Sequence, residues 1–221
     1  MTATSSNISN LHSQRLNASL AVILAAGEGR RFGSRKQFSL LRGKPLLSYS
    51  IQAAKISGLG KVMVVGGEPL PDAARLAADM GATDFVLNKN PEKGMGRSLA
   101  LAAARAREMK VKCLVVLLAD MPLVDPLVVA GVCEKTWQTN CGLAAAQVGT
   151  KWCHPVGFMA WHFSTLAACC RDKGARDLVK AHQDELGLVQ AAGESIWDID
   201  SQADLARAES YLAARELECF K

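Results

Sequence analysis

Short apolar runs alternate with longer amphipathic segments along most of the chain, and this alternation constrains the fold more than any other feature. The runs are β-branched or Leu-rich without a clean in–out alternation, which is typical of strands buried on both faces. They are Leu20–Ala26, Val62–Val65, Phe85–Leu87, Cys113–Ala119 and Leu143–Ala146. The helix-like segments between them are Pro45–Ile56, Pro71–Met80, Arg97–Met109 and Pro126–Trp137. This order predicts right-handed βαβ crossovers, and therefore an α/β fold with a mainly parallel sheet.

The pattern changes after residue 147. We expect a strand at His154–Met159, a helix at Gly174–His182, a strand at Leu188–Ala191 and a closing helix at Ser201–Arg215. Because no long linker interrupts the chain, residues 19–221 are predicted to form a single domain whose later part helps to form a substrate pocket. Residues 1–18 are rich in Ser, Thr and Asn without periodicity, and are predicted to be a flexible tail.

The composition argues against several classes of protein. The net charge is only +5, from 26 basic and 21 acidic residues, without a dense Lys/Arg block, so we expect no nucleic-acid partner. No apolar stretch reaches the roughly 20 residues of a membrane-spanning helix, so we expect no membrane partner. The seven cysteines are odd in number and form no CxxC pair. They favour reduced thiols in a cytoplasmic protein over a disulfide framework or a zinc site.

A glycine-rich segment, Leu24–Gln37, begins where the first predicted strand ends. Ligands of open α/β sheets bind at this carboxyl edge. Glycines such as Gly27 and Gly29 allow the backbone to approach a ligand closely, and the backbone N–H groups of such a loop bind phosphate oxygens. Arg31 and Lys36 add charges that can neutralise a triphosphate. The segment therefore predicts a nucleotide phosphate site.

Two carboxylates are candidate metal ligands. Asp120 follows an apolar strand, where an acid is costly unless something pairs with it, and Mg²⁺ bound to phosphates is a natural partner. The alternative role, capping the next helix, suits Asp125 better, which leaves Asp120 for metal. Asp200 is expected to end a short strand, just before a helix that Ser201 caps with Asp204 at its third position. Asp120 and Asp200 would then share one magnesium ion.

The chain also resembles the molybdenum cofactor cytidylyltransferase and guanylyltransferase group. The similar segments run in family order from about residue 20 to 210, and they are Leu24–Gln37 with Leu40–Leu47, Asn90–Leu99, Leu118–Pro122, His154–Phe158, Lys173–Arg176 and Asp198–Asp200. The resemblance implies a Rossmann-like nucleotidyltransferase fold with helices on both faces of the sheet. The opening Leu-Ala-Ala-Gly is similar to the cytidylyl branch, since the guanylyl branch usually reads Leu-Ala-Gly-Gly.

The resemblance also implies roles for individual residues. Four residues at the end of the first strand would contact base and ribose, two basic residues would contact the phosphates, and Asp120 would bind the metal. Asn88 falls where the guanylyltransferases carry an aspartate near the nucleotide, and Ser98 would belong to the base-binding turn. The implied nucleotide-binding residues are Leu24, Ala25, Ala26, Gly27, Arg31, Lys36, Asn88 and Ser98.

Together these features predict a Mg²⁺-dependent transfer of CMP from CTP to a phosphate-bearing acceptor. The resemblance implies molybdopterin in its molybdenum-loaded form as that acceptor, with hand-over to a molybdenum enzyme or its chaperone. An acceptor phosphate is already ionised at neutral pH, so no general base is assigned. His154 and Arg176 are candidates for the acceptor side, and a structural role for His154 is equally open.

Several alternatives remain. The Lys36-Gln37 pair resembles methylerythritol phosphate cytidylyltransferases, which normally carry Asp-Ala-Ala-Arg where this chain has Asp120-Met121-Pro122. Sugar-1-phosphate nucleotidyltransferases share the glycine-rich opening. An NAD(P)-dependent oxidoreductase would account for the glycines but would leave Asp120 and Asp200 without a role. A non-catalytic partner of a molybdenum enzyme would keep the fold without turnover.

Overall fold

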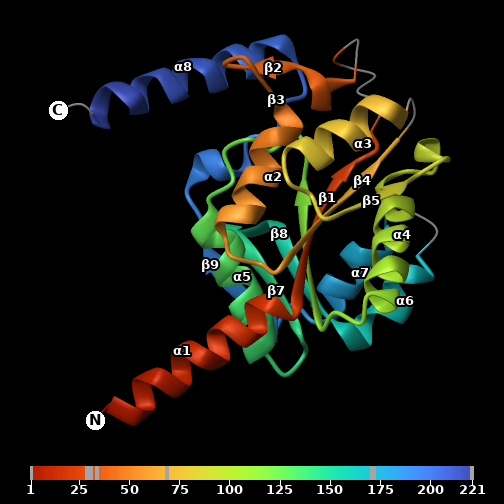
Figure 1. The fold of residues 1–221 in the computed structure, drawn as a ribbon, viewed down its shortest axis with the longest axis vertical. Coiled ribbons are helices and arrows are strands. Elements are labelled where there is room, and N and C mark those ends of the chain that lie inside the picture. Colours follow the sequence, from red (N-terminus) through yellow and green to blue (C-terminus); the bar gives the residue numbers. More distant parts are fainter. Residues whose placement is uncertain (1, 28–31, 33–34, 68–69, 170–172, 220–221) are drawn as a thin grey trace.

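A seven-stranded sheet forms the centre of the molecule (Figure 1). The computed structural model describes residues 2–27, 32, 35–67, 70–169 and 173–219. The strand order is β5-β4-β1-β6-β8-β7-β9, and within this sheet β8 runs antiparallel to both of its neighbours, whereas the other described pairings are parallel. The strands are β1 Ser19–Ala25, β4 Lys61–Gly66, β5 Asp84–Leu87, β6 Cys113–Leu118, β7 Leu143–Val148, β8 Lys151–Met159 and β9 Gly187–Gln190. The predicted α/β fold with a mainly parallel sheet is confirmed.

Helices cover both faces of this sheet. One face packs against α2 Leu46–Ile56, α3 Leu70–Asp79 and α5 Pro126–Gln138, and the other against α4 Met95–Glu108, α6 Phe163–Ala167 and α7 Lys173–Ala181. Neighbouring residues of β1 divide between the two layers: Ile23 belongs to the first and Val22 to the second, both fully buried. Burial on both faces explains why the strands read as continuous apolar runs. Among the described helices, none is both long and apolar enough to cross a membrane.

A smaller third cluster lies near the carboxyl end of the sheet. It joins the two-stranded ribbon of β2 Leu40–Leu41 and β3 Lys44–Pro45 to the last helix, α8 Gln202–Cys219. Figure 1 shows α8 beside this ribbon, above the main sheet. Leu41 and Ile199 are fully buried in the cluster. The contact brings the end of the chain back to the segment that follows β1.

The predicted flexible tail is instead a helix, α1 Thr2–Asn17. Contacts made by its last turns explain the difference. Arg15 forms an ion pair with Glu134 of α5, Leu16 packs against the core, and Gly60 donates its N–H to the Leu16 carbonyl at 2.9 Å. A composition rich in Ser, Thr and Asn does not reveal such contacts, so the prediction for residues 1–18 is wrong in secondary structure.

Candidate functional site

Lys36, Asp120 and Asp200 meet beyond the carboxyl ends of the central strands. The Lys36 Nζ atom lies 2.7 Å from Oδ2 of Asp120 and 2.5 Å from Oδ1 of Asp200. These two carboxylate oxygens are therefore at most 5.2 Å apart, the sum of the two distances. The geometry brings together three of the residues named from the sequence. Their roles toward phosphate and metal stay predictions.

Backbone hydrogen bonds position the two carboxylates. Asp120 follows β6, and its carbonyl accepts the N–H of Ile199 at 2.9 Å. This bond fixes the segment that carries Asp200 against the end of the strand. The expectation that Asp200 ends a strand is wrong, because residues 197–200 have no regular secondary structure. Convergence of the two acids therefore comes from a loop held to β6 and not from two neighbouring strands.

The start of α8 fixes Asp200 from the other side. Asp204 accepts hydrogen bonds at one carboxylate oxygen from the Ser201 N–H at 2.8 Å, the Ser201 hydroxyl at 2.6 Å and the Asp200 N–H at 3.2 Å. The Ser201 hydroxyl in turn accepts the Asp204 N–H at 3.2 Å. This reciprocal arrangement is a capping box, as the sequence predicted. The predicted cap of α5 is confirmed as well, since Asp125 accepts the Leu127 N–H at 2.8 Å.

The charges of this cluster are unevenly compensated. Burial by itself would lower the pKa of Lys36, but the charges of Asp120 and Asp200 and the hydrogen bonds to them outweigh it, so the pKa is raised and the ammonium stays charged. The second oxygen of Asp120, Oδ1, is buried and has no hydrogen-bond partner among the described residues. A buried carboxylate oxygen in that condition is costly, and a cation is its natural partner.

The donor set suits a hard divalent cation. Mg²⁺ is usually held by one or two carboxylates, with waters and substrate phosphates completing its coordination. Asp120 and Asp200 supply such a pair within reach of each other. Within the described ranges no group of three or more His, Cys, Asp and Glu side chains is arranged to hold a metal ion. A site built here would therefore depend on a bound phosphate for its remaining ligands.

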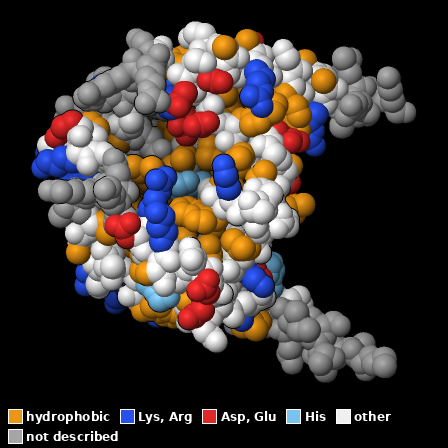
Figure 2. Space-filling model, turned by 180° about the vertical axis from the view of Figure 1, so that it is seen from behind, with side chains coloured by type: hydrophobic (Ala, Val, Ile, Leu, Met, Phe, Trp, Pro, Cys, Tyr) orange, Lys and Arg blue, Asp and Glu red, His pale blue; other side chains and the backbone are white. Residues whose placement is uncertain are grey.

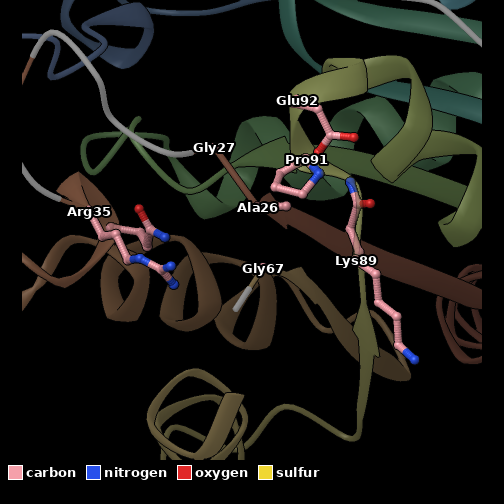
Figure 3. Close-up of a pocket in the computed structure, with 9 residues that line it drawn as sticks. Ala26, Gly27, Arg35, Gly67, Lys89, Pro91 and Glu92 are labelled. Carbon is pink, nitrogen blue, oxygen red and sulfur yellow. The ribbon is translucent and has the colours of Figure 1, made fainter. Parts of the chain in front are cut away.

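A cavity of about 260 Å³ lies at the ends of β1 and β4, and its lining includes both chain neighbours of Lys36. Figure 3 shows Ala26 and Gly27 at the end of β1, with Arg35 on one side of the cavity and Pro91 and Glu92 on the other. The remaining lining residues are Gln37, Gly67, Asn88 and Lys89. Among the residues that the structure describes, no atom lies within 4 Å of a Cβ added at Gly27, so the backbone there is open to a ligand. The cavity has the position predicted for the nucleotide.

Other predicted nucleotide-binding residues fall into three groups. Leu24 and Ala25 lie in β1 and are mostly buried. Asn88 lines the cavity and is fully buried, donating its amide N–H to the Ser98 hydroxyl at 3.0 Å and accepting the Asn90 N–H at 3.0 Å. These bonds give Asn88 and Ser98 a role in holding the turn that forms one wall. Further predicted positions lie outside the described residues, namely Gly29 and Arg31.

His154, an acceptor-side candidate, lies on β8 beside the carboxylate cluster. It lines a small hollow together with Met121 and Val124. Burial lowers the pKa of His154 to about 4, the charge of Asp120 opposes this shift, and the charge of Arg176 adds to it. His154 is therefore neutral at pH 7, while the exposed Arg176 of α7 is a cation close enough to act on it. Figure 2 shows hydrophobic side chains and a histidine in a hollow flanked by Lys or Arg side chains.

Sequence reasoning did not give roles to two residues beside the cluster. Arg35 and Gln37 flank Lys36 in the sequence, and both line the cavity. The basic residues near position 35 and the Lys36-Gln37 pair were visible as patterns. The short 3-10 helix at Lys36–Phe38 determines which side chain points toward the carboxylates and which toward the cavity. No periodic pattern in the sequence predicts this helix.

The fold and the comparisons with known proteins define the class as nucleotide-dependent transferases. The chain belongs to the MobA-like NTP transferase domain family, whose model matches residues 21–186. It is 30% identical over 193 residues to the purine catabolism protein PucB of Bacillus subtilis, covering 82% of this chain and 91% of that protein. The protein is therefore a nucleotidyltransferase, and the oxidoreductase alternative is set aside.

Solved structures share the fold. Rv0371c from Mycobacterium tuberculosis H37Rv has a TM-score of 0.74 and 25% identity, over 87% of this chain and 97% of that one. A structure of Rv0371c in complex with manganese has a TM-score of 0.71 and 24% identity, over 87% and 98%. The molybdopterin-guanine dinucleotide biosynthesis protein A of Archaeoglobus fulgidus shares the fold, with a TM-score of 0.66 and 19% identity over 88% and 99%.

Proposed function

We propose that the protein transfers CMP from CTP to a phosphate-bearing acceptor, with Mg²⁺ as cofactor and pyrophosphate as the second product. The observation that carries the proposal is the carboxylate pair Asp120–Asp200, with a buried oxygen that lacks a partner, beside a cavity at the end of β1. The metal, held by Asp120 and Asp200, would polarise the α-phosphate and offset the charge that develops there.

The chain's own residues perform the remaining tasks. The open backbone at Gly27 lets the triphosphate approach the end of β1 closely. Lys36, which pairs with both carboxylates, would turn from them to the phosphates and stabilise the departing pyrophosphate. Arg31, which lies outside the described residues, is proposed to assist there. Because the attacking acceptor phosphate is already ionised, no side chain needs to remove a proton.

We propose molybdopterin in its molybdenum-loaded form as the acceptor. Arg176 supplies a positive charge for the acceptor's phosphate, and the neutral His154 can exchange only a hydrogen bond with it. Hand-over of the product to a molybdenum enzyme or its chaperone in the cytoplasm is part of the same proposal.

Pyrophosphate release tests the proposal directly. The purified protein is supplied with each of the four nucleoside triphosphates, Mg²⁺, and molybdopterin with or without molybdate. We expect release with CTP that depends on both the acceptor and the metal, and none in excess EDTA. Faster release with GTP would reject the choice of base, and release with a methylerythritol phosphate or a sugar phosphate would reject the acceptor. Absence of release with every combination would contradict transfer itself.

A further inference from the structure

We propose that Gln37, assisted by Arg35, reads the edge of the base in the bound nucleotide and selects a pyrimidine over guanine. The inference rests on the proposed function, because it takes the occupant of the cavity to be a nucleoside triphosphate. It concerns two neighbours of Lys36 that line the same cavity. Arg35 and Gln37 would bind the base in the cavity, whereas the transfer reaction would take place at the carboxylates that Lys36 contacts.

Gln37 is a buried amide that faces the cavity. Its exposed fraction is 5%, and it directly follows Lys36 in the 3-10 helix Lys36–Phe38. In the described part of the chain its side chain forms no hydrogen bond, although it lines the 260 Å³ cavity. Because Gln37 borders the cavity, its amide can form hydrogen bonds with whatever fills the cavity. An occupant of the cavity with polar edges would satisfy it.

The other amide of the cavity is already engaged. Asn88 donates to the Ser98 hydroxyl and accepts the Asn90 N–H, both at 3.0 Å. These bonds hold the wall formed by the turn after β5, so the Asn88 side chain is committed to the protein. Lys89 and Glu92 also line the cavity but are exposed, and water competes for their charges. Among these cavity residues, Gln37 is therefore the buried one whose amide is available to form hydrogen bonds with a ligand.

The chemistry of the pair favours a pyrimidine. A carboxamide presents one acceptor and one donor side by side, which match the 4-amino group and N3 of cytosine. The Arg35 guanidinium, which lines the same cavity, has only donors and suits the O2 atom of a pyrimidine. Guanine presents two donors and one acceptor along the same edge. One of its N–H groups would therefore face a donor, and an unpaired polar group is strongly disfavoured in a buried site.

Binding of three ligands to matched variants tests this role. We would measure Kd by calorimetry for CTP, GTP and inorganic tripolyphosphate, each with Mg²⁺, on the wild type, Gln37→Ala and Gln37→Glu. Gln37→Ala should weaken CTP about tenfold, the value of a lost hydrogen-bonded pair in a buried site, and leave tripolyphosphate unchanged. Gln37→Glu supplies two acceptors for the two donors of guanine and should shift the CTP-to-GTP preference toward GTP. Gln52→Ala, which removes an exposed amide from α2, is the control and should change nothing.

Other outcomes would overturn the inference. Equal weakening of CTP and tripolyphosphate in Gln37→Ala would give Gln37 a phosphate-binding or structural role. An unchanged preference in the nearly isosteric Gln37→Glu would exclude contact with the base. A wild type that binds tripolyphosphate but does not distinguish CTP from GTP would also reject base reading while leaving the phosphate site intact. A wild type that binds none of the three ligands would remove the proposed function, and the inference with it.

Discussion

Lys36 can pair its ammonium either with the two carboxylates of the site or with the phosphates of a bound nucleotide, but not with both at once. Its ammonium lies within hydrogen-bond distance of both Asp120 and Asp200, where a divalent cation would also lie. The sequence suggested phosphate as its partner. Both roles are compatible if a metal ion displaces the ammonium, which then turns to the phosphates. The residue would neutralise the carboxylates until metal and nucleotide arrive together.

Replacing Lys36 tests this competition. Lys36→Met should bind Mn²⁺ more tightly in the absence of nucleotide, by about fivefold, because a competing charge worth roughly 1 kcal/mol is removed. The variant should also unfold at a lower temperature without metal, since two neighbouring carboxylates lose their counter-ion. Electron paramagnetic resonance titration with Mn²⁺ measures the first effect. Lys44→Met, at an exposed position, is the control, and an unchanged or weaker Mn²⁺ affinity in Lys36→Met would contradict the competition.

His154 gives the site a dependence on pH. Its pKa is lowered to about 4 in the folded protein, whereas an unfolded histidine has a pKa near 6.5. Between these values the unfolded chain takes up a proton that the folded chain does not, so stability is lost as the pH falls. We expect the wild type to lose on the order of 1 to 2 kcal/mol through this group between about pH 7 and about pH 5.

Urea unfolding at both pH values measures that loss. His154→Gln removes the titrating group, so its stability should fall less than that of the wild type over the same interval. His12→Gln, at an exposed position on α1, should behave as the wild type does. If His154→Gln and the wild type lose equal stability, the histidine is not held neutral by the fold.

The strands and helices of the sheet region could be predicted from the sequence because the buried positions of each element appear as a regular pattern of apolar residues. The predicted run Cys113–Ala119 corresponds to β6, and the predicted helix Pro126–Trp137 to α5. Contacts between distant segments leave no such signature. The ion pair that joins α1 to Glu134, and the bond that fixes the loop before α8 to Asp120, are both of this kind. Hence Asp200 was named from its acid-rich context, but its placement on a strand was wrong.

The capping box at the start of α8 holds the backbone of Asp200, one of the two carboxylates of the site. Asp204→Ala should lower the stability of the protein, because the N–H groups of Asp200 and Ser201 lose their acceptor, and should free the backbone of Asp200. Mn²⁺ affinity should therefore fall although the variant keeps both carboxylates of the cluster. Ser210→Ala, at an exposed site later in α8, is the matched control. A variant that loses stability but binds Mn²⁺ as tightly as the wild type would show that the cap does not position Asp200.

At the scale of the whole molecule, the site is a junction of three distant stretches of chain. Lys36 follows β1, Asp120 follows β6, and Asp200 precedes the last helix, which packs beside the ribbon β2–β3. No local pattern in the sequence specifies this junction, whereas each contributing residue stands out in its own segment. A ligand held by all three stretches therefore stabilises the entire fold, because unfolding any one of them releases it.

Thermal unfolding with combinations of CTP and metal tests that coupling. CTP with Mg²⁺ at about a hundred times its Kd should stabilise the wild type by roughly 2.7 kcal/mol, which corresponds to a rise in Tm of about 5 to 10 °C for a chain of this size. CTP with EDTA should give a much smaller rise.

Asp120→Asn should lose the metal-dependent part of this rise in Tm, because a neutral amide is a poor ligand for Mg²⁺. Its Tm without ligands should change little, since losing the ion pair with Lys36 is offset by removing a carboxylate whose Oδ1 atom is buried without a partner. Asp79→Asn, on the exposed surface of α3, should keep the full metal-dependent rise. An equal rise with EDTA and with Mg²⁺ in the wild type would mean that the triphosphate binds without metal, and Asp120 would then have to be assigned to holding Lys36 alone.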